Sequence, residues 1–507
     1  MADDTLVRGT RARVYDKMRR REFLQRGLLS LAAIPAFRFE TLAAGKELRR
    51  PRTPKRVVII GAGLAGLSAC YQLTQAGHDV TILEARTRAG GRVHTLREPF
   101  ADGLHAEAGA MFIPDSHDLT MHYVRLFRIP LIPIPMQKRS SVLYLNGKRF
   151  TSEDERTINR LLTLSPEEKR LGLDGMTDKY LIPVLNEMGD ARSTDWPPER
   201  LKKYDRISYA EFLRSRGATP DALRLLRLND ADLTGDGVDA VSALMVLRES
   251  ALNQNAVELY TVRGGTDLLP KALAAHLASK IRYGSPVTKI EQDARQVRVS
   301  FLQAGNRETV TADYLISAIP FTILREIEVT PQFSEQKQRA IRELQYTSVV
   351  RVYVQSRREF WTDAGLGVSA YTDLPIMAII NSTLNQPGTR GILESYMAGE
   401  NARRAAAMSE GERLDFTASE MEKVYPGVRK NFEGGASVAW DEDRWARGAY
   451  SWFKPGQMTK LLPHIARTEG RIHFAGEHTS SWPGWMQGAF QSGHRAAREI
   501  NEAEGTS

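Results

Sequence analysis

Residues 57–93 have the sequence VVIIGAGLAGLSACYQLTQAGHDVTILEARTRAGGRV, and this stretch decides the fold. Its apolar start, residues 57–60, predicts a strand that is buried on both faces. Gly61, Gly63 and Gly66 follow at G-x-G-x-x-G spacing, and a helix is predicted over Leu64–Gln75. The first glycine permits a tight turn, the second lets the backbone approach a pyrophosphate, and the third lets the helix pack on the strand. The stretch therefore predicts an anion site at a helix N-terminus.

A second strand and an acid complete the pattern. Asp79–Leu83 is the predicted strand, and Glu84 follows it about 20 residues after the glycines, where a carboxylate accepts hydrogen bonds from ribose hydroxyls. A glycine-rich turn alone also occurs for structural reasons, but strand, turn, helix, strand and acid in this order favour a dinucleotide site. Gly90, Gly91 and Arg92 add a second glycine turn and a cation, which favours FAD over NAD.

The length and charge of the chain limit the other possibilities. A chain of 507 residues is long for one hydrophobic core, so we expect two domains. The first 56 residues hold 15 of the 70 lysines and arginines and 6 of the 61 acidic residues, which leaves 55 of each sign in the rest. The basic charge thus belongs to the leader. A nucleic-acid partner is not expected, because it would require a basic stripe on the folded part.

The leader has the features of an export signal. Arg20 and Arg21 begin the run RREFLQ, which resembles a twin-arginine signal, and a short apolar segment follows at residues 27–37. About ten apolar residues are too few to span a bilayer as a helix. We therefore expect export to the periplasm or secretion, without stable membrane insertion; the alternative is a basic tail with no targeting role. The one cysteine, Cys70, excludes an internal disulfide and is interpreted as a small core residue.

The rest of the chain leaves and re-enters the first domain. Residues 116–252 have mostly helical spacing, including a helix start at Ser165, which is followed by proline and, three residues on, by Glu168. A helix is predicted at residues 268–280, and strands are predicted at residues 286–290, 296–301 and 314–319.

These elements predict an α/β protein with an FAD-binding Rossmann-like domain of the glutathione-reductase type and a discontinuous α+β substrate domain. The leader and linker take residues 1–50. The FAD-binding domain takes residues 51–115, 253–330 and 456–507, and the substrate domain with its helical insertion takes residues 116–252 and 331–455.

Two C-terminal motifs specify the family. Residues 471–479, RIHFAGEHT, predict a strand ending in glycine and acid, and residues 485–493, WMQGAFQSG, open the last helix. The N-terminus of such a helix, pointed at a flavin pyrimidine ring, would stabilise negative charge there after reduction. Together with the N-terminal stretch, these motifs resemble the flavin-containing amine oxidase superfamily, which includes monoamine, polyamine and L-amino acid oxidases. The resemblance covers residues 55–501.

The resemblance implies FAD contacts in each motif. The implied cofactor residues are Gly61, Gly63, Ala65, Gly66, Glu84, Ala85, Gly91, Arg92, Gly109, Ala110, Met111, Val287, Gly476, Glu477, Trp485 and Met486. Ala449 stands where covalently flavinylated monoamine oxidases have a cysteine, so noncovalent FAD is expected. His473, His478 and His494 lie near the flavin motifs, but their spacing predicts no metal site, and they are interpreted as core or solvated residues.

The resemblance also implies the reaction. A primary or secondary amine loses a hydride equivalent from the carbon next to nitrogen, and the resulting imine hydrolyses to an aldehyde or ketone while O2 becomes hydrogen peroxide. The partners are then a small-molecule amine and O2, and a homodimer is left open.

Two aromatic residues are the first candidates for substrate contact. Tyr450 and Trp485 match the aromatic pair that flanks the path to the flavin in the family's amine oxidases. Facing rings steer an amine nitrogen through their electron-rich faces, an effect of about 1 kcal/mol. Aromatic residues that only pack in the core are the alternative.

Phe112 bears on the substrate class. The family's amino acid oxidases usually have an arginine here, which binds the substrate carboxylate through two hydrogen bonds. Where those enzymes place a tyrosine, near residues 375–382, this chain has Ile379, Ile380 and Asn381. Because a buried carboxylate needs a cationic partner, an amine is favoured. An L-amino acid bound by another arginine is the alternative.

Arg351 is the last candidate catalytic residue. Family oxidases commonly have a lysine at this point, bridged by water to the flavin and implicated in oxygen reactivity. Arginine keeps the charge but is bulkier and has a different donor geometry. A dehydrogenase with another electron acceptor, or a flavin-binding protein without turnover, is therefore an alternative to an oxidase, and a structural ion pair is the alternative role for Arg351.

Overall fold

The computed structural model describes residues 48–134, 141–151, 154–193, 195–229, 235–363 and 369–503. All of them belong to one compact unit. The twin-arginine motif and the other predictions for the leader lie outside the described residues. Among the described helices, none is long and apolar enough to cross a membrane.

A parallel five-stranded sheet carries the glycine turn. Its order is β10 (Ile281–Arg282), β2 (Asp79–Leu83), β1 (Arg56–Ile60), β14 (Tyr314–Ser317) and β23 (Ile472–Phe474). The last four residues of β1 are buried, as expected for a central parallel strand. The predicted first strand, the helix α2 (Leu64–Gln75) and the second strand are confirmed.

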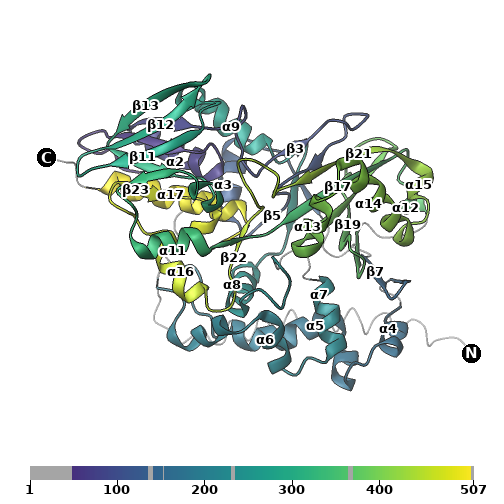
Figure 1. The fold of residues 1–507 in the computed structure, drawn as a ribbon. Helices are drawn as coiled ribbons and strands as arrows, with labels where there is room; N and C mark the ends of the chain where they lie inside the picture. The colour runs from purple at the N-terminus through teal and green to yellow at the C-terminus, as the bar shows by residue number, and fades with distance from the viewer. Residues whose placement is uncertain are drawn as a thin grey trace, which may run out of the picture. The chain divides into compact units, whose positions relative to one another are not determined.

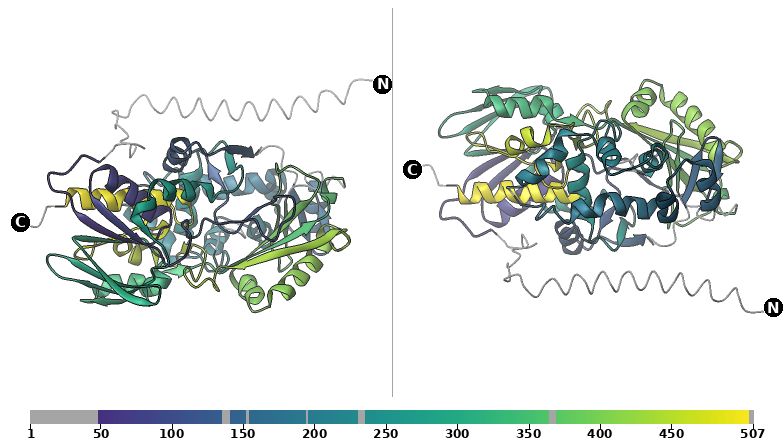
Figure 2. Two further views of the ribbon diagram at one scale, coloured as in Figure 1. Left: turned by 90° about the horizontal axis from the view of Figure 1, so that it is seen from above. Right: turned by 90° about the horizontal axis from the view of Figure 1, so that it is seen from below.

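The two ends of the described chain meet on this sheet. The C-terminal helix α17 (Met486–Glu502), yellow in Figure 2, runs beside the purple N-terminal strands and α2. Gly493 permits this contact, because a Cβ there would lie 2.4 Å from the carbonyl oxygen of Ala65 in α2. The glycine turn and the C-terminal motif thus lie in one layer although they are far apart in sequence.

A four-stranded sheet flanks the parallel one. Its order is β13 (Asn306–Ala312), β12 (Val297–Gln303), β11 (Val287–Gln292) and β15 (Glu328–Thr330). The predicted strands at residues 286–290 and 296–301 are confirmed, and the one at residues 314–319 ends earlier, at Ser317. The predicted helix at residues 268–280 is shorter: α9 (Leu268–His276) is followed by a separate 3-10 turn, Ala278–Lys280.

A seven-stranded sheet forms the second large layer, at the right in Figure 1. Its order is β21 (Phe432–Ala439), β17 (Val349–Ser356), β20 (Gly391–Ala398), β19 (Ala378–Asn381), β18 (Ser369–Thr372), β7 (Ser141–Leu145) and β8 (Lys148–Phe150). The strands β7 and β8 fall in a region with predicted helical spacing, so that prediction is wrong here. The two strands form a hairpin around Asn146 and Gly147, which both have positive φ.

The remaining elements connect these layers. The small sheets are β5 (Ile113–Pro114), β9 (Leu259–Val262) and β6 (Leu131–Ile134), then β3 (Thr95–Leu96) with β4 (Ala106–Glu107), and β16 (Gln345–Tyr346) with β22 (Ser451–Trp452). The other helices are α3 (Asp118–Leu126), α10 (Phe321–Leu324), α11 (Glu335–Glu343), α12 (Phe360–Asp363), α13 (Gly399–Ala406), α14 (Glu410–Val424), α15 (Val428–Asn431), α16 (Met458–Ile465) and the 3-10 turn Glu477–Thr479.

The predicted helical insertion lies at the bottom of Figure 1. It contains α4 (Glu155–Leu161), α5 (Pro166–Leu185), the 3-10 helix η4 (Glu199–Arg206), α6 (Tyr209–Ser215), α7 (Pro220–Asn229) and α8 (Ala243–Asn253). The predicted start of α5 is confirmed: Ser165 and Glu168 form a capping box. The helix is interrupted at Gly172, whose φ is 65°. The assignment of whole segments to an FAD-binding and a substrate domain stays a prediction.

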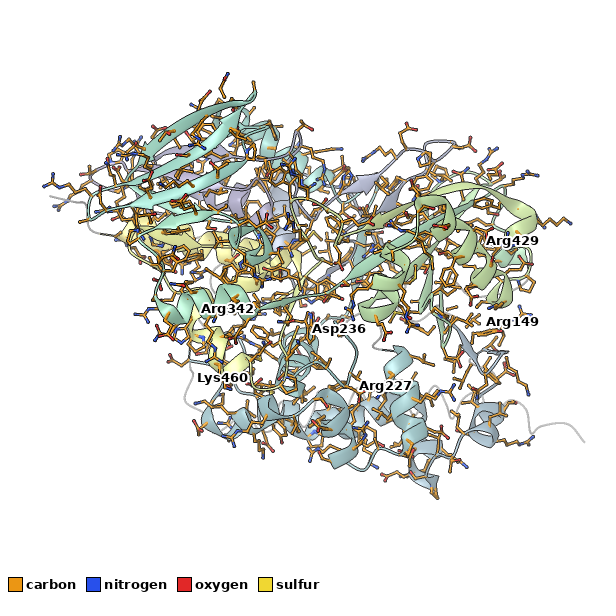
Figure 3. All side chains as sticks on the ribbon, viewed as in Figure 1. Arg149, Arg227, Asp236, Arg342, Arg429 and Lys460 are labelled. Atoms are coloured by element: carbon orange, nitrogen blue, oxygen red, sulfur yellow. The ribbon has the colours of Figure 1, made fainter. Side chains whose placement is uncertain are left out.

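Polar contacts fix the insertion against its neighbours. Asp236, labelled in Figure 3, lies beside α13 and accepts a hydrogen bond from Arg403 Nη1 at 2.7 Å. Asp205, which is fully buried in η4, accepts from Ser242 Oγ at the start of α8 and from the backbone N–H groups of Met458 and Thr459 at the start of α16. Asp205 therefore links α8 to the C-terminal part of the chain.

Replacing Asp205 with alanine is expected to lower the free energy of unfolding by about 2–4 kcal/mol, because several buried donors lose their acceptor. Urea unfolding of purified Asp205→Ala protein measures this loss. Asp195→Ala, which removes an exposed carboxylate, is the matched control and should change stability by less than about 0.5 kcal/mol. Equal stability of the two variants would contradict the linking role of Asp205.

Candidate functional site

One large cavity brings the predicted site residues together. It has about 1970 Å³ of empty space, including the part open to solvent. The predicted cofactor residues that line it are Gly61, Gly63, Ala65, Glu84, Ala85, Gly91, Arg92, Gly109, Ala110, Met111, Val287, Gly476, Glu477, Trp485 and Met486. The predicted catalytic residues Phe112, Arg351 and Tyr450 line the same cavity. The residues predicted to contact the cofactor and those predicted to contact the substrate thus line one cavity.

The three glycines of the turn have different surroundings. Gly61 has a φ of 100°, and a Cβ there would lie 3.1 Å from Ile319 Cγ2. Gly66 does not line the cavity; its Cβ would lie 2.0 Å from the Gly61 carbonyl oxygen, so it permits α2 to pack on the turn. At Gly63 a Cβ would meet no atom within 4 Å and would project into the cavity. Gly63 therefore leaves space for a ligand rather than for protein.

Two helix N-termini face the cavity without side-chain caps. Gly63 is the N-cap of α2 and Trp485 is the N-cap of α17, and neither helix has an acidic residue in its first turn. Such ends present free backbone N–H groups and partial positive charge to an anion. The N-terminus of α2 could therefore bind the diphosphate of FAD, and the N-terminus of α17 could stabilise negative charge on its flavin ring.

Glu84 fits the ribose of such a cofactor. Its carboxylate is buried and accepts hydrogen bonds from the N–H groups of Ala62 at 2.7 Å and Arg86 at 2.8 Å. Burial raises the pKa of Glu84, and these hydrogen bonds act against that rise. Each oxygen accepts one of these bonds and has a second lone pair for a hydroxyl donor.

Arg92 joins the second glycine turn to the C-terminal motif. Its Nη1 lies 2.8 Å from Glu477 Oε1 and 2.6 Å from the carbonyl oxygen of Ala449. Glu477 also accepts from Ser451 Oγ and the Gly484 N–H. Burial alone would raise the pKa of Glu477, but Arg92 and these hydrogen bonds outweigh it and lower the pKa. The pair fixes one side of the cavity wall.

Aromatic side chains form another part of the cavity wall, here called its aromatic end. The hydroxyl groups of Tyr396 and Tyr450 are 3.4 Å apart, and the Tyr450 ring packs against Gly484, next to Trp485. The Trp485 indole donates a hydrogen bond to Glu249 Oε1 at 2.8 Å. All four side chains line the cavity.

Sequence reasoning missed two of these residues, Tyr396 and Glu249. Tyr396 comes from β20, whose pairing with β17 places it opposite Arg351. Glu249 comes from α8, one helical turn after Met245, which also lines the cavity. Both residues have polar neighbours in sequence, Glu394 and Ser395 in β20 and Arg248 and Ser250 in α8, so no local pattern identifies them.

Arg351 is held by several groups. Its Nη1 donates to the carbonyl oxygen of Glu107 at 2.8 Å and lies 3.3 Å from Glu394 Oε1, and its guanidinium stacks over Tyr396 at 4.8 Å. The side chain of Arg351 is 12% exposed and that of Glu394 is fully buried. Burial acts against the charge on Arg351, but Glu394 outweighs it and raises the guanidinium pKa. Arg351 therefore combines a structural ion pair with a place on the cavity wall.

The arginines that line the cavity are all paired with acids. Among the described lining residues these are Arg86, which pairs with Asp443 at 2.5 Å, together with Arg92 and Arg351. Phe112 and Ile380 are apolar lining residues, whereas Ile379 is buried elsewhere. The aromatic end of the cavity thus contains an acid, Glu249. Every arginine among the described lining residues has an acidic partner.

The histidines and the cysteine have core environments. His473 bonds to Glu499 and His494 bonds to Tyr123. His478 is buried among Phe321 and other apolar groups, and burial lowers its pKa to about 3, so it is neutral. No group of three potential metal ligands occurs in the part of the chain that the structure describes. Cys70 is fully buried, which raises its thiol pKa to about 12 and confirms it as a core residue.

The parallel sheet, the glycine turn and the cavity define a flavin-dependent oxidoreductase. The chain belongs to the flavin-containing amine oxidoreductase family, whose model matches residues 64–501, so the family resemblance is confirmed. It is 36% identical over 460 residues to YobN of Bacillus subtilis (strain 168), whose name assigns it provisionally as an L-amino-acid oxidase; the match covers 88% of this chain and 95% of that protein. It is 30% identical over 475 residues to the L-amino-acid oxidase BmooLAAO-I of Bothrops moojeni, covering 91% and 92%.

Solved structures with similar folds are amine oxidases. A double mutant of putrescine oxidase has a TM-score of 0.76 at 20% identity, covering 88% of this chain and 99% of that one. Cyclohexylamine oxidase from Brevibacterium oxydans IH-35A has a TM-score of 0.75 at 21% identity, covering 89% and 99%. The predicted α/β FAD-binding fold class is confirmed.

Proposed function

We propose that the protein binds FAD noncovalently and oxidises a primary or secondary amine to an imine. The observation that carries the proposal is the aromatic end of the cavity, where Trp485 bonds to Glu249 and Tyr450 lines the same cavity, while each described lining arginine is already paired with an acid. A cationic or neutral amine is compatible with this environment. A substrate carboxylate bound in this part of the cavity would lose its hydration and would have no cationic side chain to pair with, because the lining arginines are paired already.

The residues of the chain have separate roles in this scheme. Bound FAD would supply the acceptor for a hydride equivalent from the carbon next to the amine nitrogen. Gly63, Glu84 and the N-terminus of α2 would hold its diphosphate and ribose, and the N-terminus of α17 would stabilise negative charge on its ring system. Tyr450 and Trp485 would orient the amine nitrogen, and Phe112 would help to exclude water.

Turnover with oxygen tests this function. A peroxidase-coupled assay with primary and secondary amines is expected to detect hydrogen peroxide, and the imine should appear as an aldehyde or ketone. Amine-dependent reduction of the flavin without peroxide would instead favour a dehydrogenase with another acceptor, the alternative raised by Arg351. Failure of every amine to reduce the flavin would contradict the proposal.

An L-amino acid is the second candidate substrate. It is favoured by the names of the sequence relatives, and the Tyr396 hydroxyl group on the cavity wall, which donates to the Tyr450 hydroxyl at 3.4 Å, could donate to a carboxylate instead. One neutral donor compensates a carboxylate less than an arginine does, which is why we rank the amine first.

Noncovalent attachment is supported by the cavity lining. Ala449 lines the cavity, whereas neither cysteine nor histidine is among its described lining residues. Acid precipitation should therefore leave the yellow flavin in the supernatant. Flavin that stays with the precipitated protein would contradict this.

We also propose export through the twin-arginine leader, on the sequence alone. Replacing Arg20 and Arg21 together with lysine should retain the protein in the cytoplasm of a host with a twin-arginine pathway. Unchanged export of this variant would contradict the proposal.

A further inference from the structure

The ring of His117 packs behind Trp485. His117 is the N-cap residue of α3; it is fully buried and is not among the described residues that line the cavity. The centroid of its imidazole lies 5.0 Å from that of the Trp485 indole, with the planes at 86°, and 4.7 Å from that of Trp482, with the planes at 75°. Edge-to-face contacts of this kind favour one relative orientation of the rings. His117 therefore contacts a proposed substrate residue from outside the lining of the cavity.

The start of α3 is fixed to the start of α17. Gln487, two residues after Trp485, accepts hydrogen bonds at its Oε1 from the N–H groups of Leu119 at 3.1 Å and Thr120 at 3.0 Å. These N–H groups belong to the first turn of α3 and have no acceptor within the helix. Gln487 is buried, so the two bonds are shielded from water. The backbone of His117 is thus held at a fixed place relative to Trp485.

The imidazole of His117 acts as a neutral ring. Burial lowers the pKa of His117 to about 4. The Asn253 amide, at the end of α8, lies close to the imidazole and acts against this lowering, but the two side chains are not aligned for a hydrogen bond. What His117 offers to Trp485 is therefore the packing of a planar ring, without a charge.

We propose that His117 is a positioning residue for the reaction, whose ring holds the Trp485 indole in the orientation that the substrate nitrogen requires. This inference rests on the proposed amine oxidation and adds a residue that acts through Trp485. The indole is then fixed at two places, by the hydrogen bond from its Nε1 to Glu249 and by the ring contact with His117. Misplacement of an orienting group by about 1 Å can slow a reaction roughly 100-fold.

The test is anaerobic reduction of the purified holoenzyme by butylamine, N-methylbutylamine and benzylamine, with rates expressed per bound flavin. His117→Leu fills most of the space of the imidazole but has no planar ring. It should lower the limiting reduction rate about tenfold or more for the amine that reduces the wild type fastest. His117→Phe restores a planar ring and should keep the rate within about threefold of the wild type. A loss of stability or of FAD content alone would leave the rate per bound flavin unchanged.

A double variant tests whether His117 acts through Trp485. Once Trp485→Ala has removed the indole, adding His117→Leu should cause no further loss of the limiting reduction rate, because the two residues act as one unit. Losses that add up in the double variant would overturn the proposal.

His122→Leu is the matched control. His122 lies on the same helix and packs its partly buried ring against Tyr123, so its replacement should leave the rate per bound flavin unchanged. An unchanged rate in His117→Leu, equal losses in His117→Leu and His117→Phe, or an equal loss in His122→Leu would overturn the role of His117 while leaving amine oxidation intact. Failure of all three amines to reduce the wild-type flavin would overturn the proposed function itself.

Discussion

Replacing Gly66 with alanine is expected to produce a protein that no longer retains FAD. The new methyl group would lie 2.0 Å from the carbonyl oxygen of Gly61, a backbone atom that no side-chain rotation can move away. The turn and α2 would have to separate, which should cost about 3 kcal/mol or more in the free energy of unfolding. The flavin-to-protein absorbance ratio after purification measures the loss of cofactor, and thermal unfolding measures the loss of stability.

Gly63→Ala is the matched control for this prediction. Its methyl group meets no protein atom within 4 Å, so the protein without FAD should be as stable as the wild type. The methyl group projects into the cavity, however, and should weaken FAD binding by crowding the diphosphate. A Gly66→Ala protein with full FAD content and wild-type stability would contradict the assigned role of the third glycine.

Replacing Glu394 with glutamine is expected to lower the free energy of unfolding by about 3–5 kcal/mol, because it leaves the buried Arg351 guanidinium without its acid. Removing both charges, as Glu394→Gln with Arg351→Met, should recover most of this loss. Denaturant unfolding of the two variants and the wild type measures the coupling.

Ser382→Ala provides a graded control for the ion pair. Ser382 donates a hydrogen bond to Glu394 Oε2 at 2.7 Å, and its removal keeps both charges, so the expected loss is only about 1 kcal/mol. A single Glu394→Gln variant as stable as the wild type, or a double variant no better than the single one, would contradict the ion-pair interpretation.

The cofactor half of the fold could be predicted from sequence because its signals are local. The glycine turn, α2 and β2 lie within one short stretch. In the insertion, the capping box of Ser165 and Glu168 was predictable for the same reason, because it spans one helical turn. In each case the residues that stabilise the turn or the helix start lie within a few positions of it in the sequence.

The substrate end could be predicted only in part, because it is assembled by distant pairings. Tyr396 reaches the cavity through the register of β20 on β17, and Glu249 through the packing of the insertion. No short sequence motif encodes the register of two distant strands or the packing of the insertion. The strands β7 and β8 were missed although the Asn146–Gly147 turn between them is a local hairpin signal. Only the pairing of β7 with β18, more than two hundred residues later, depends on distant sequence.

The position of Arg351 also needed the structure. The sequence identified an unusual residue but left a structural ion pair and a role beside the cofactor as alternatives. The structure combines the two, because Arg351 pairs with Glu394 and also lines the cavity. The charge of Arg351 is therefore balanced by a buried acid, and Arg351 is a weaker partner for a substrate carboxylate than an unpaired arginine would be.

The most direct test of the central claim is anaerobic reduction of the yellow holoenzyme by four related compounds. Butylamine and 1,4-diaminobutane are compared with L-norvaline and L-ornithine, which have the same carbon chains with a carboxylate on the carbon that bears the amine. Our account predicts that the two amines bleach the flavin and the two amino acids do not. Bleaching by L-norvaline or L-ornithine but by neither amine would contradict it, because the cavity would then bind a carboxylate that its paired arginines and Phe112 should exclude.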